Sequence, residues 1–340
     1  MEKLTMMDIA KLADVSIATV SNYINGKDKK MSKKTKTKLA RIIKDNDFIP
    51  NSTARDLAKN ENNTIGVSIA DITNPFTTPV ISGIYDACYS AGYRVVITNA
   101  DNDENREIQN IKNLKQDNMS GIIVDPVNAD GKIYDELSNK NTVLVDRQAK
   151  QTKIDTVVTD NFEAVRLMTQ AMLENKYTEM YFVTWPLNHV STRMNRYNGF
   201  KSAIEDIKPE LKDNIITVPH HGKQQDYDKF NQTIFSIMDR KYLGKIGFFT
   251  MNARVLLRLL RVMNNLGYHY PEDYGLATYE EFDWMLVMNP GISCIRQDSF
   301  QIGVQAMEIL RHKILKQNEK DIDIPSIKIV STQQIYRASF

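Results

Sequence analysis

Residues 5–26 read TMMDIAKLADVSIATVSNYING. Apolar side chains recur in this stretch at helical spacing, which predicts two short helices over residues 6–13 and 17–24. Asn25-Gly26 is a typical helix end, and a third helix should begin after Ser32. Two helices around a tight turn, with a third behind them, are typical of a helix-turn-helix, a fold that reads DNA in the major groove.

The side chains of these helices divide into an inner and an outer set. Thr5 and Ser16 can cap the first two helices. The side chains expected inside are Ile9, Leu12, Ala13, Val20, Tyr23, Ile24, Leu39, Ile42 and Ile43. Those expected in solvent on the third helix are Lys33, Lys34, Lys36, Lys38 and Arg41. A three-helix bundle without any ligand is the alternative, but it would not need Ile17, Ala18 and Asn22 exposed together on the second helix.

Charge is distributed unevenly along the 340 residues. Residues 1–60 hold 13 Lys and Arg against 7 Asp and Glu, a net charge of +6, and the remainder has a net charge of −4. A basic unit before an acidic body is typical of polyanion binding, although short basic ends can also be plain solvated surface. The length predicts two or three domains, and 42% hydrophobic residues fit a globular protein.

Residues 5–26 resemble the headpiece of the lactose-repressor (LacI/GalR) family, and the segments 31–35 and 48–58 support this resemblance. The resemblance implies that Ile17, Ala18 and Asn22 face base edges and that hydroxyl and amide side chains lie near phosphates. The DNA-binding candidates are Thr5, Ser16, Ile17, Ala18, Thr19, Ser21, Asn22, Asn25, Ser32, Thr35, Asn51, Ala54 and Leu57.

Residues 51–59 predict a helix that is too short to be stable alone. The resemblance makes it a hinge helix that pairs with its copy in a dimer and pushes Leu57 into the minor groove as an apolar wedge. The alternative is that Leu57 is a linker residue packed on the body.

From residue 64 onward, β-branched runs alternate with helical stretches, which predicts parallel sheets covered by helices. The expected fold class is an all-α helix-turn-helix headpiece plus an α/β body of two doubly wound lobes, similar to periplasmic binding proteins. The expected domains are a headpiece over 1–50, a hinge over 51–60, and an effector-binding and dimerisation domain over 61–340, with an N-lobe at 61–160 and 293–325 and a C-lobe at 161–292 and 326–340. A core-facing helix is expected near 251–266, with Arg254, Arg258 and Arg261 as an outer basic stripe.

Ligands of such sheets bind beyond the carboxyl ends of the strands, and the resemblance implies an effector cleft there, between the lobes. The effector-binding candidates are Asp71, Phe76, Asp146, Arg147, Arg196, Asn252, Glu280 and Trp284. Ala253 and Glu280 stand where the family usually has Asp, so the effector cannot be inherited from the family. Residues 279–284 and 289–297 resemble the branch that includes regulators of ketodeoxygluconate use, which favours a sugar acid as the effector. Arg193 and Arg196 could each instead be ordinary members of surface ion pairs.

Other kinds of site have little support in the sequence. Nucleotide-binding glycine patterns are absent, and His220-His221 has no partner that would complete a metal site. No nucleophile and base can be recognised, so we expect no enzyme and no cofactor. Cys88 and Cys294 lie in apolar runs as expected buried thiols, and neither a signal peptide nor a membrane span is recognisable, so a cytoplasmic location is expected.

These patterns together predict a homodimeric, operator-binding repressor controlled by a sugar or sugar acid. A dimer is expected because one short helix reads too few bases of a pseudo-palindromic operator, and because no heptad tail for tetramers precedes Phe340. The main alternative is a solute-binding or sensor protein that uses the same two lobes without direct repression, and an enzyme is the weakest candidate.

Overall fold

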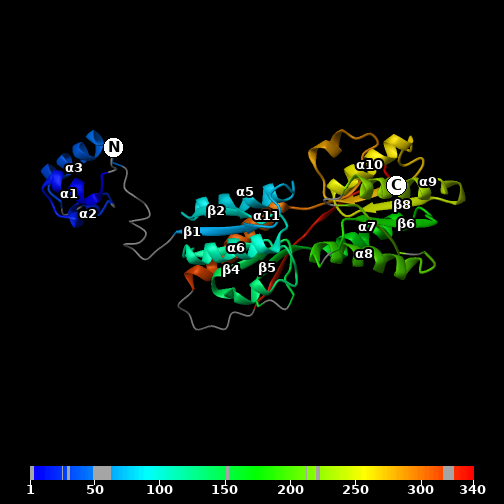
Figure 1. Cartoon of the computed structure of the whole chain (residues 1–340), viewed down its shortest axis with the longest axis horizontal. Coiled ribbons are helices and arrows are strands. Elements are labelled where there is room, and N and C mark those ends of the chain that lie inside the picture. Colours follow the sequence, from blue (N-terminus) through cyan, green and yellow to red (C-terminus); the bar gives the residue numbers. More distant parts are fainter. Residues whose placement is uncertain are drawn as a thin grey trace. The chain divides into compact units, whose positions relative to one another are not determined.

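The computed structural model describes residues 4–24, 26–28, 31–48, 63–150, 153–187, 189–211, 213–219, 223–316 and 325–340. The chain forms two compact units, residues 1–63 and 64–340, which we call the headpiece and the body (Figure 1). The predicted hinge, with its candidates Asn51, Ala54 and Leu57, lies outside the described residues, as do Asn25 and the His220-His221 pair. In the described part of the chain, no helix is long and apolar enough to cross a membrane.

The headpiece contains the three predicted helices, α1 (Met6–Ala13), α2 (Ile17–Ile24) and α3 (Lys33–Asp45). Each begins at the predicted hydroxyl cap. The Oγ atoms of Thr5, Ser16 and Ser32 accept hydrogen bonds from backbone N–H groups in the first turns, at 3.3, 3.1 and 3.1 Å. These bonds satisfy donors that a helix start otherwise leaves free.

The headpiece core corrects one expectation. The buried apolar residues are Ile9, Ala10, Ala13, Val20, Leu39 and Phe48. Leu12, which the sequence placed inside, is 52% exposed. Ala10 and Leu12 flank the Ile9–Ala13 stripe on opposite sides, and periodicity does not reveal which flank the neighbouring helices cover.

The first lobe of the body is built on a six-stranded sheet whose order is β11-β5-β4-β3-β1-β2. Every neighbouring pair in this sheet is parallel. Its strands are β1 (Thr64–Ile69), β2 (Arg94–Asn99), β3 (Gly121–Val124), β4 (Thr142–Val145), β5 (Thr156–Thr159) and β11 (Ile327–Val330). One face packs on α5 (Thr77–Ser90) and α11 (Ser299–Leu315), and the other packs on α6 (Glu104–Gln116) (Figure 1). The 3-10 helices η1 (Lys132–Glu136) and η2 (Asn139–Asn141) precede β4.

The second lobe has a sheet of order β12-β10-β9-β8-β6-β7, in which only the β10–β12 pair is antiparallel. Its strands are β6 (Glu179–Thr184), β7 (Asp213–Thr217), β8 (Ile246–Thr250), β9 (Gly275–Tyr279), β10 (Ser293–Arg296) and β12 (Gln333–Ile335). Its helices are α7 (Asn161–Leu173), α8 (Ser191–Ile207), α9 (Gln224–Met238) and α10 (Ala253–Leu266), with 3-10 helices η3 (Lys241–Leu243) and η4 (Asp283–Val287).

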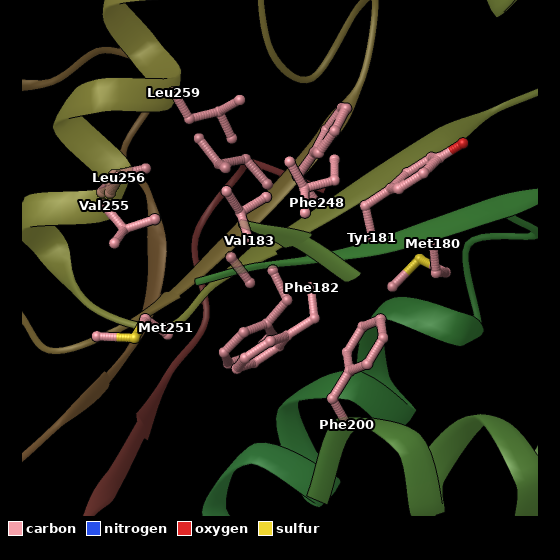
Figure 2. Packing of buried hydrophobic residues seen from close by; sticks show 14 of the residues in the cluster. Met180, Tyr181, Phe182, Val183, Phe200, Phe248, Met251, Val255, Leu256 and Leu259 are labelled. Atoms are coloured by element: carbon pink, nitrogen blue, oxygen red, sulfur yellow. The ribbon is translucent and has the colours of Figure 1, made fainter. Parts of the chain in front are cut away.

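Strand alternation divides the second lobe's core between the two faces of its sheet (Figure 2). Phe182 packs against Phe200 of α8 and against Phe249, with ring centroids 5.4 and 5.8 Å apart. The residues that precede Phe182 and Phe249 face the opposite side of the sheet, where Tyr181 stacks on Phe248 with ring centroids 5.5 Å apart. Both faces of the sheet are therefore buried, as the nearly continuous apolar runs predict for parallel strands.

The chain passes between the lobes after β5, after β10 and after β11, and these crossings correct the predicted lobe boundaries. We expected the chain to enter the N-lobe at residue 293, but Ser293–Arg296 pairs with β9 in the second sheet. We expected residue 326 to enter the C-lobe, but Ile327–Val330 pairs with β5 in the first sheet. An apolar run fits either sheet equally well, so only the pairing decides between them.

Close helix crossings in both lobes require glycine. In the first lobe, a Cβ atom on Gly83 of α5 would lie 2.1 Å from the carbonyl oxygen of Phe300, and one on Gly303 of α11 would lie 2.1 Å from that of Val80. In the second lobe, a Cβ atom on Gly199 of α8 would lie 2.2 Å from the carbonyl oxygen of Phe162 on α7. The helix backbones of these two pairs therefore touch directly.

Strand order marks where a ligand would bind. In the first sheet the direction of winding reverses between β1 and β3, and in the second it reverses between β6 and β8. Ligands of doubly wound sheets bind beyond the carboxyl ends of the strands at such switch points. These ends carry Asp71 and Asp125 in one lobe and Trp185 and Asn252 in the other.

Candidate DNA-binding and effector sites

The exposed face of α2 carries the side chains predicted to read bases. Ile17 is 48% exposed although it is apolar, and Ala18 and Asn22 are exposed beside it. Val20 on the opposite face is fully buried in the headpiece core. The helix therefore holds its position through one face and leaves small, apolar and amide groups on the other, which suits contact with base edges.

Hydroxyl groups lie in pairs at the starts of α2 and α3. Ser16 and Thr19 are joined Oγ to Oγ1 at 2.9 Å, and Ser32 and Thr35 at 2.8 Å. Ser21 on α2 is partly exposed. Helix N-termini carry a partial positive charge and free N–H groups, so these predicted phosphate neighbours stand where a phosphate would be favoured.

The cations of α3 form an exposed surface on the headpiece. Lys33, Lys34, Lys38 and Arg41 are exposed. Lys36, also predicted to be in solvent, pairs with Asp28 at 2.8 Å and is only partly exposed. The exposed cations can supply the sequence-independent part of DNA binding.

Asn22 gives a first testable prediction. A carboxamide bonds adenine through a donor and an acceptor, whereas arginine suits guanine. We therefore expect an A·T pair at the operator position opposite Asn22, and a shift to guanine in Asn22→Arg, with a preference of about tenfold or more. Selection of binding sites from random DNA by both proteins measures this. A requirement for guanine by the unmodified protein, or the same preference in both proteins, would contradict the assignment.

In the body, Arg196 of α8 joins groups from three other elements. Its Nε donates to Asn161 Oδ1 at the start of α7 at 2.7 Å, and its NH1 group donates to the carbonyl oxygen of Met251 at 3.0 Å. The same group lies 4.0 Å from Glu280 Oε1, and the guanidinium stacks on Tyr279 with 3.6 Å to the ring centroid. Arg196 is buried, so it is not the surface ion-pair member that the sequence allowed.

Arg147 lies between two buried carboxyl groups of the first lobe. Its Nε is 3.6 Å from Asp125 Oδ1 and 3.9 Å from Asp146 Oδ2. Burial raises the pKa of Asp125 to about 7 against the attraction of Arg147, and burial also raises the pKa of Asp146. Asp125 Oδ1 and Asp146 Oδ1 accept no hydrogen bond from any residue that the structure describes.

The two positions that depart from the family pattern touch one another. Glu280 Oε2 accepts a hydrogen bond from the backbone N–H of Ala253 at 3.4 Å, and burial raises the pKa of Glu280 to about 7. Asn252 caps α10 through a bond from the Val255 N–H at 2.9 Å. The Glu280 side chain therefore reaches the backbone at the start of α10.

Asp71 is bonded across the lobes to α10. Its Oδ2 atom lies 3.3 Å from Arg254 NH1, and its Oδ1 accepts bonds from Thr73. Burial alone would raise the pKa of Asp71, but the bonds from Thr73 and the charge of Arg254 hold it below its usual value. We expected Arg254 to belong to an outer basic stripe, and this was wrong. The first turn of α10 faces the other lobe, where Arg254 pairs with Asp71.

Phe76 and Trp284, the aromatic residues predicted to line the effector site, lie in the cores of the lobes and not beside the buried arginines. Phe76 is buried in the core of the first lobe, and Trp284 packs against the core of the second. Besides Tyr279, the Trp185 ring lies beside these arginines, with its centroid 5.4 Å from the Arg193 guanidinium and 5.1 Å from that of Arg254. Trp185 directly follows β6, so the strand-end rule that selected Asp71 could also have selected it.

Three residues near these arginines were not predicted as site residues, namely Asp125, Trp185 and Arg254, and for Arg193 the sequence left open a surface ion pair. Asp125 directly follows the apolar run of β3 (Gly121–Val124), so its place at a strand end was a usable signal. Arg193 and Arg254 lie in the first turns of helices, and no pattern in the chain shows that these turns converge.

Elsewhere, the predicted free thiols are confirmed. Cys88 and Cys294 are buried, and burial raises the pKa of each to about 12. Among the described residues, no group of three His, Cys, Asp or Glu side chains could hold a metal ion.

Family models match both units of the chain. The model of bacterial regulatory proteins of the lacI family matches residues 5–51, and that of the periplasmic binding protein domain matches residues 65–320. The chain belongs to the lacI family of bacterial regulatory proteins. The predicted family and fold class are thereby confirmed, and this lacI-family regulator is a helix-turn-helix transcriptional regulator.

Curated relatives of this lacI-family regulator span nearly its whole length. The HTH-type transcriptional regulator KdgR of Bacillus subtilis is 27% identical over 337 residues, which cover 98% of this chain and 97% of that protein. PtxS of Pseudomonas aeruginosa is 30% identical over 309 residues, which cover 91% and 88%. The match to KdgR agrees with the predicted branch. A lac repressor dimer, solved with operator and the anti-inducer ONPF, superposes with a TM-score of 0.82 at 18% identity and covers 99% of both chains.

Proposed function

We propose that this regulator is a dimeric repressor whose affinity for a pseudo-palindromic operator changes when a sugar or sugar acid binds between the lobes of its body. The main support is the pair of buried carboxylate oxygens, Asp125 Oδ1 and Asp146 Oδ1, that accept no hydrogen bond from the described residues. Buried acceptors are normally satisfied, and sugar hydroxyls are donors of suitable size. The roles of the DNA-binding and effector-binding candidates are part of this proposal.

The lobes are joined by polar contacts that a ligand could rearrange. Besides Asp71–Arg254, Asp130 Oδ2 pairs with His189 Nδ1 at 2.9 Å, and the Gln148 N–H donates to Ser191 Oγ at 2.7 Å. A ligand that binds one arrangement of the lobes more tightly shifts the protein towards it. We propose that the hinge at 51–60 transmits this shift to the headpiece, with Leu57 as the wedge in the minor groove.

Coupling of this kind is reciprocal, so operator DNA must change effector affinity by the same factor. The protein would act in the cytoplasm, where its operator lies, and without catalysis, like the transcription regulators it resembles. A solute-binding protein with the same body would have no need of the headpiece that the lacI-family model matches.

The proposal is tested with the full-length protein. An operator is first selected from random DNA, and its dissociation constant is then measured by fluorescence anisotropy with each member of a panel of sugars and sugar acids. We expect at least one ligand to change operator affinity fivefold or more, the lower end of typical allosteric coupling. Failure to select any specific sequence would contradict a repressor.

A matched variant separates the two halves of the proposal. Ile17→Asp places a carboxylate on the exposed face of α2 without disturbing the headpiece core. It should abolish operator binding and leave ligand binding to the body unchanged. Ligands that bind tightly but never alter operator affinity would instead favour the solute-binding function.

A further inference from the structure

A buried hydrogen bond joins the two lobes at a point where the chain crosses between them. The hydroxyl groups of Thr159 and Tyr279 lie 3.0 Å apart, and both residues are buried. Thr159 ends β5, which pairs with β4 and β11 in the first sheet, whereas Tyr279 ends β9 in the second. The Tyr279 ring packs in the core of the second lobe, so its hydroxyl is fixed to that lobe. The bond therefore depends on the orientation of one lobe relative to the other.

The same threonine extends this bond to the second crossing of the chain. The Thr159 hydroxyl donates to Gln297 Oε1 at 3.3 Å, and Gln297 follows β10 where the chain passes to α11. A hydroxyl has one hydrogen, so while Thr159 donates to Gln297 it accepts from Tyr279. The third crossing is tied to the first, because the Thr332 N–H donates to Asp160 Oδ1 at 3.1 Å. Hydrogen bonds thus connect all three crossings, and we call the chain Tyr279–Thr159–Gln297 the crossing relay.

Arg196 contacts the crossing relay from two sides. Its guanidinium lies over the Tyr279 ring, with 3.6 Å to the centroid, and its Nε donates to Asn161 Oδ1 at 2.7 Å. Asn161 in turn donates through Nδ2 to the carbonyl oxygen of Thr159 at 3.2 Å. These contacts form a closed ring of four buried residues, Arg196, Asn161, Thr159 and Tyr279. Because protein interiors are close-packed, a displacement of Arg196 is passed on to the bond between the lobes.

A buried bond of this kind distinguishes sharply between arrangements of the lobes. Hydrogen bonds weaken steeply with misalignment, and a buried group that loses its partner bears the full cost of desolvation. The Gln297 amide nitrogen is also buried and donates to no other part of the chain that the structure describes, so it can take a new acceptor when the lobes move. The crossing relay therefore contributes a different free energy to each arrangement.

We propose that the crossing relay transmits contact between the effector and Arg196 to the angle between the lobes, and thereby sets operator affinity. This inference rests on the proposed function and names the residues that regulate it. A ligand that displaces Arg196 makes or breaks the Tyr279–Thr159 bond, and the lobes change their relative orientation. Loss of the Tyr279 hydroxyl should therefore change regulation without removing the ligand contact, because the ring under Arg196 remains.

The test uses Tyr279→Phe and Thr159→Val in the full-length protein. Operator dissociation constants are measured by anisotropy without ligand and with saturating ribose, glucose, gluconate, glucuronate or galacturonate. For a compound that alters operator affinity, the weaker-binding of the two conditions reports the lobe equilibrium almost in proportion, because the binding-competent arrangement is then the minor one. We expect both variants to change that dissociation constant at least twofold, the lower end of what one hydrogen bond contributes.

Further variants separate regulation from a loss of packing. Tyr177→Phe removes another buried hydroxyl of the second lobe, one that bonds no described residue, and should leave the operator constants unchanged. Thr159→Ser keeps the hydroxyl and should behave like the unmodified protein. The double variant Tyr279→Phe/Thr159→Val should change the constant by less than the product of the two single changes, because both substitutions remove the same bond.

The outcomes distinguish the relay from the proposed function. A change of less than twofold in both single variants, with the ligand response intact, would overturn the relay alone. An equal change in Tyr177→Phe, or a double variant that shows the full product, would also overturn it. If operator affinity responds to none of the compounds, the proposed function fails, and the relay fails with it.

Discussion

In Arg196→Ala, effector binding should weaken by at least a hundredfold while operator binding persists, so that the variant represses without responding. Arg196 donates to Asn161 and Met251 and stacks on Tyr279, so no other residue can take over its contacts. Truncating one partner of a buried, hydrogen-bonded charge pair typically costs about 2–5 kcal/mol of binding. Arg196→Lys should not restore the response, because an ammonium group cannot reproduce the planar fork of the guanidinium.

The same substitution should lower the free energy of unfolding of the body by roughly 3 kcal/mol, because it leaves Glu280 buried without its cation. Burial raises the pKa of Glu280 to about 7, and loss of Arg196 would raise it further. When folding raises the pKa of a carboxyl group, the free energy of unfolding decreases as the pH rises from the unfolded-state pKa to the folded-state pKa. The difference in the free energy of unfolding between Arg196→Ala and the unmodified protein should therefore grow above pH 7. Urea unfolding at pH 6 and pH 8 measures it, with Arg258→Ala as control, and an equal deficit at both pH values would contradict this account.

Gly199→Ala should destabilise the body by roughly 3 kcal/mol, although alanine is the better helix former. In an exposed helix the change would stabilise by about 1 kcal/mol. Here a Cβ atom would lie 2.2 Å from the Phe162 carbonyl oxygen, so α8 would have to move away from α7. That movement would also stretch the Arg196–Asn161 bond, and effector affinity should fall with stability.

The neighbouring position supplies the matched control. Asn198 is exposed on the same turn of α8, and Asn198→Ala should be neutral or slightly stabilising. Thermal and urea unfolding then compare the effect of an introduced alanine at two adjacent positions of α8. A Gly199→Ala protein as stable as the unmodified one would show that the α7–α8 contact yields without cost.

The sequence predicted those features that depend on local pattern. Helix caps at Thr5, Ser16 and Ser32 follow from local chemistry, and the alternation of strands with helices defines the doubly wound sheets. Polar residues at strand ends led to Asp71, Asp146 and Arg147, which the structure places in or beside the buried cluster.

What escaped prediction depends on contacts between distant segments. The allocation of β10 and β11 to their sheets is a matter of pairing, and both have apolar patterns that fit either sheet. The sequence does not decide whether Arg193 is buried, because its burial depends on the packing of α8 against Trp185 and Pro186 after β6. Trp284 was a candidate and Trp185 was not, although Trp185 directly follows β6 and so stands at a strand end.

The order of strands has a consequence for how the protein is made. The first lobe contains β11 and the second contains β12, and these two strands, which follow all the others in the described part of the chain, complete one sheet each. On the ribosome, neither lobe can close while these residues are still inside the exit tunnel, whereas the headpiece is free to fold early. Until β11 and β12 have emerged from the tunnel, the body exposes unpaired sheet edges at β5 and β10.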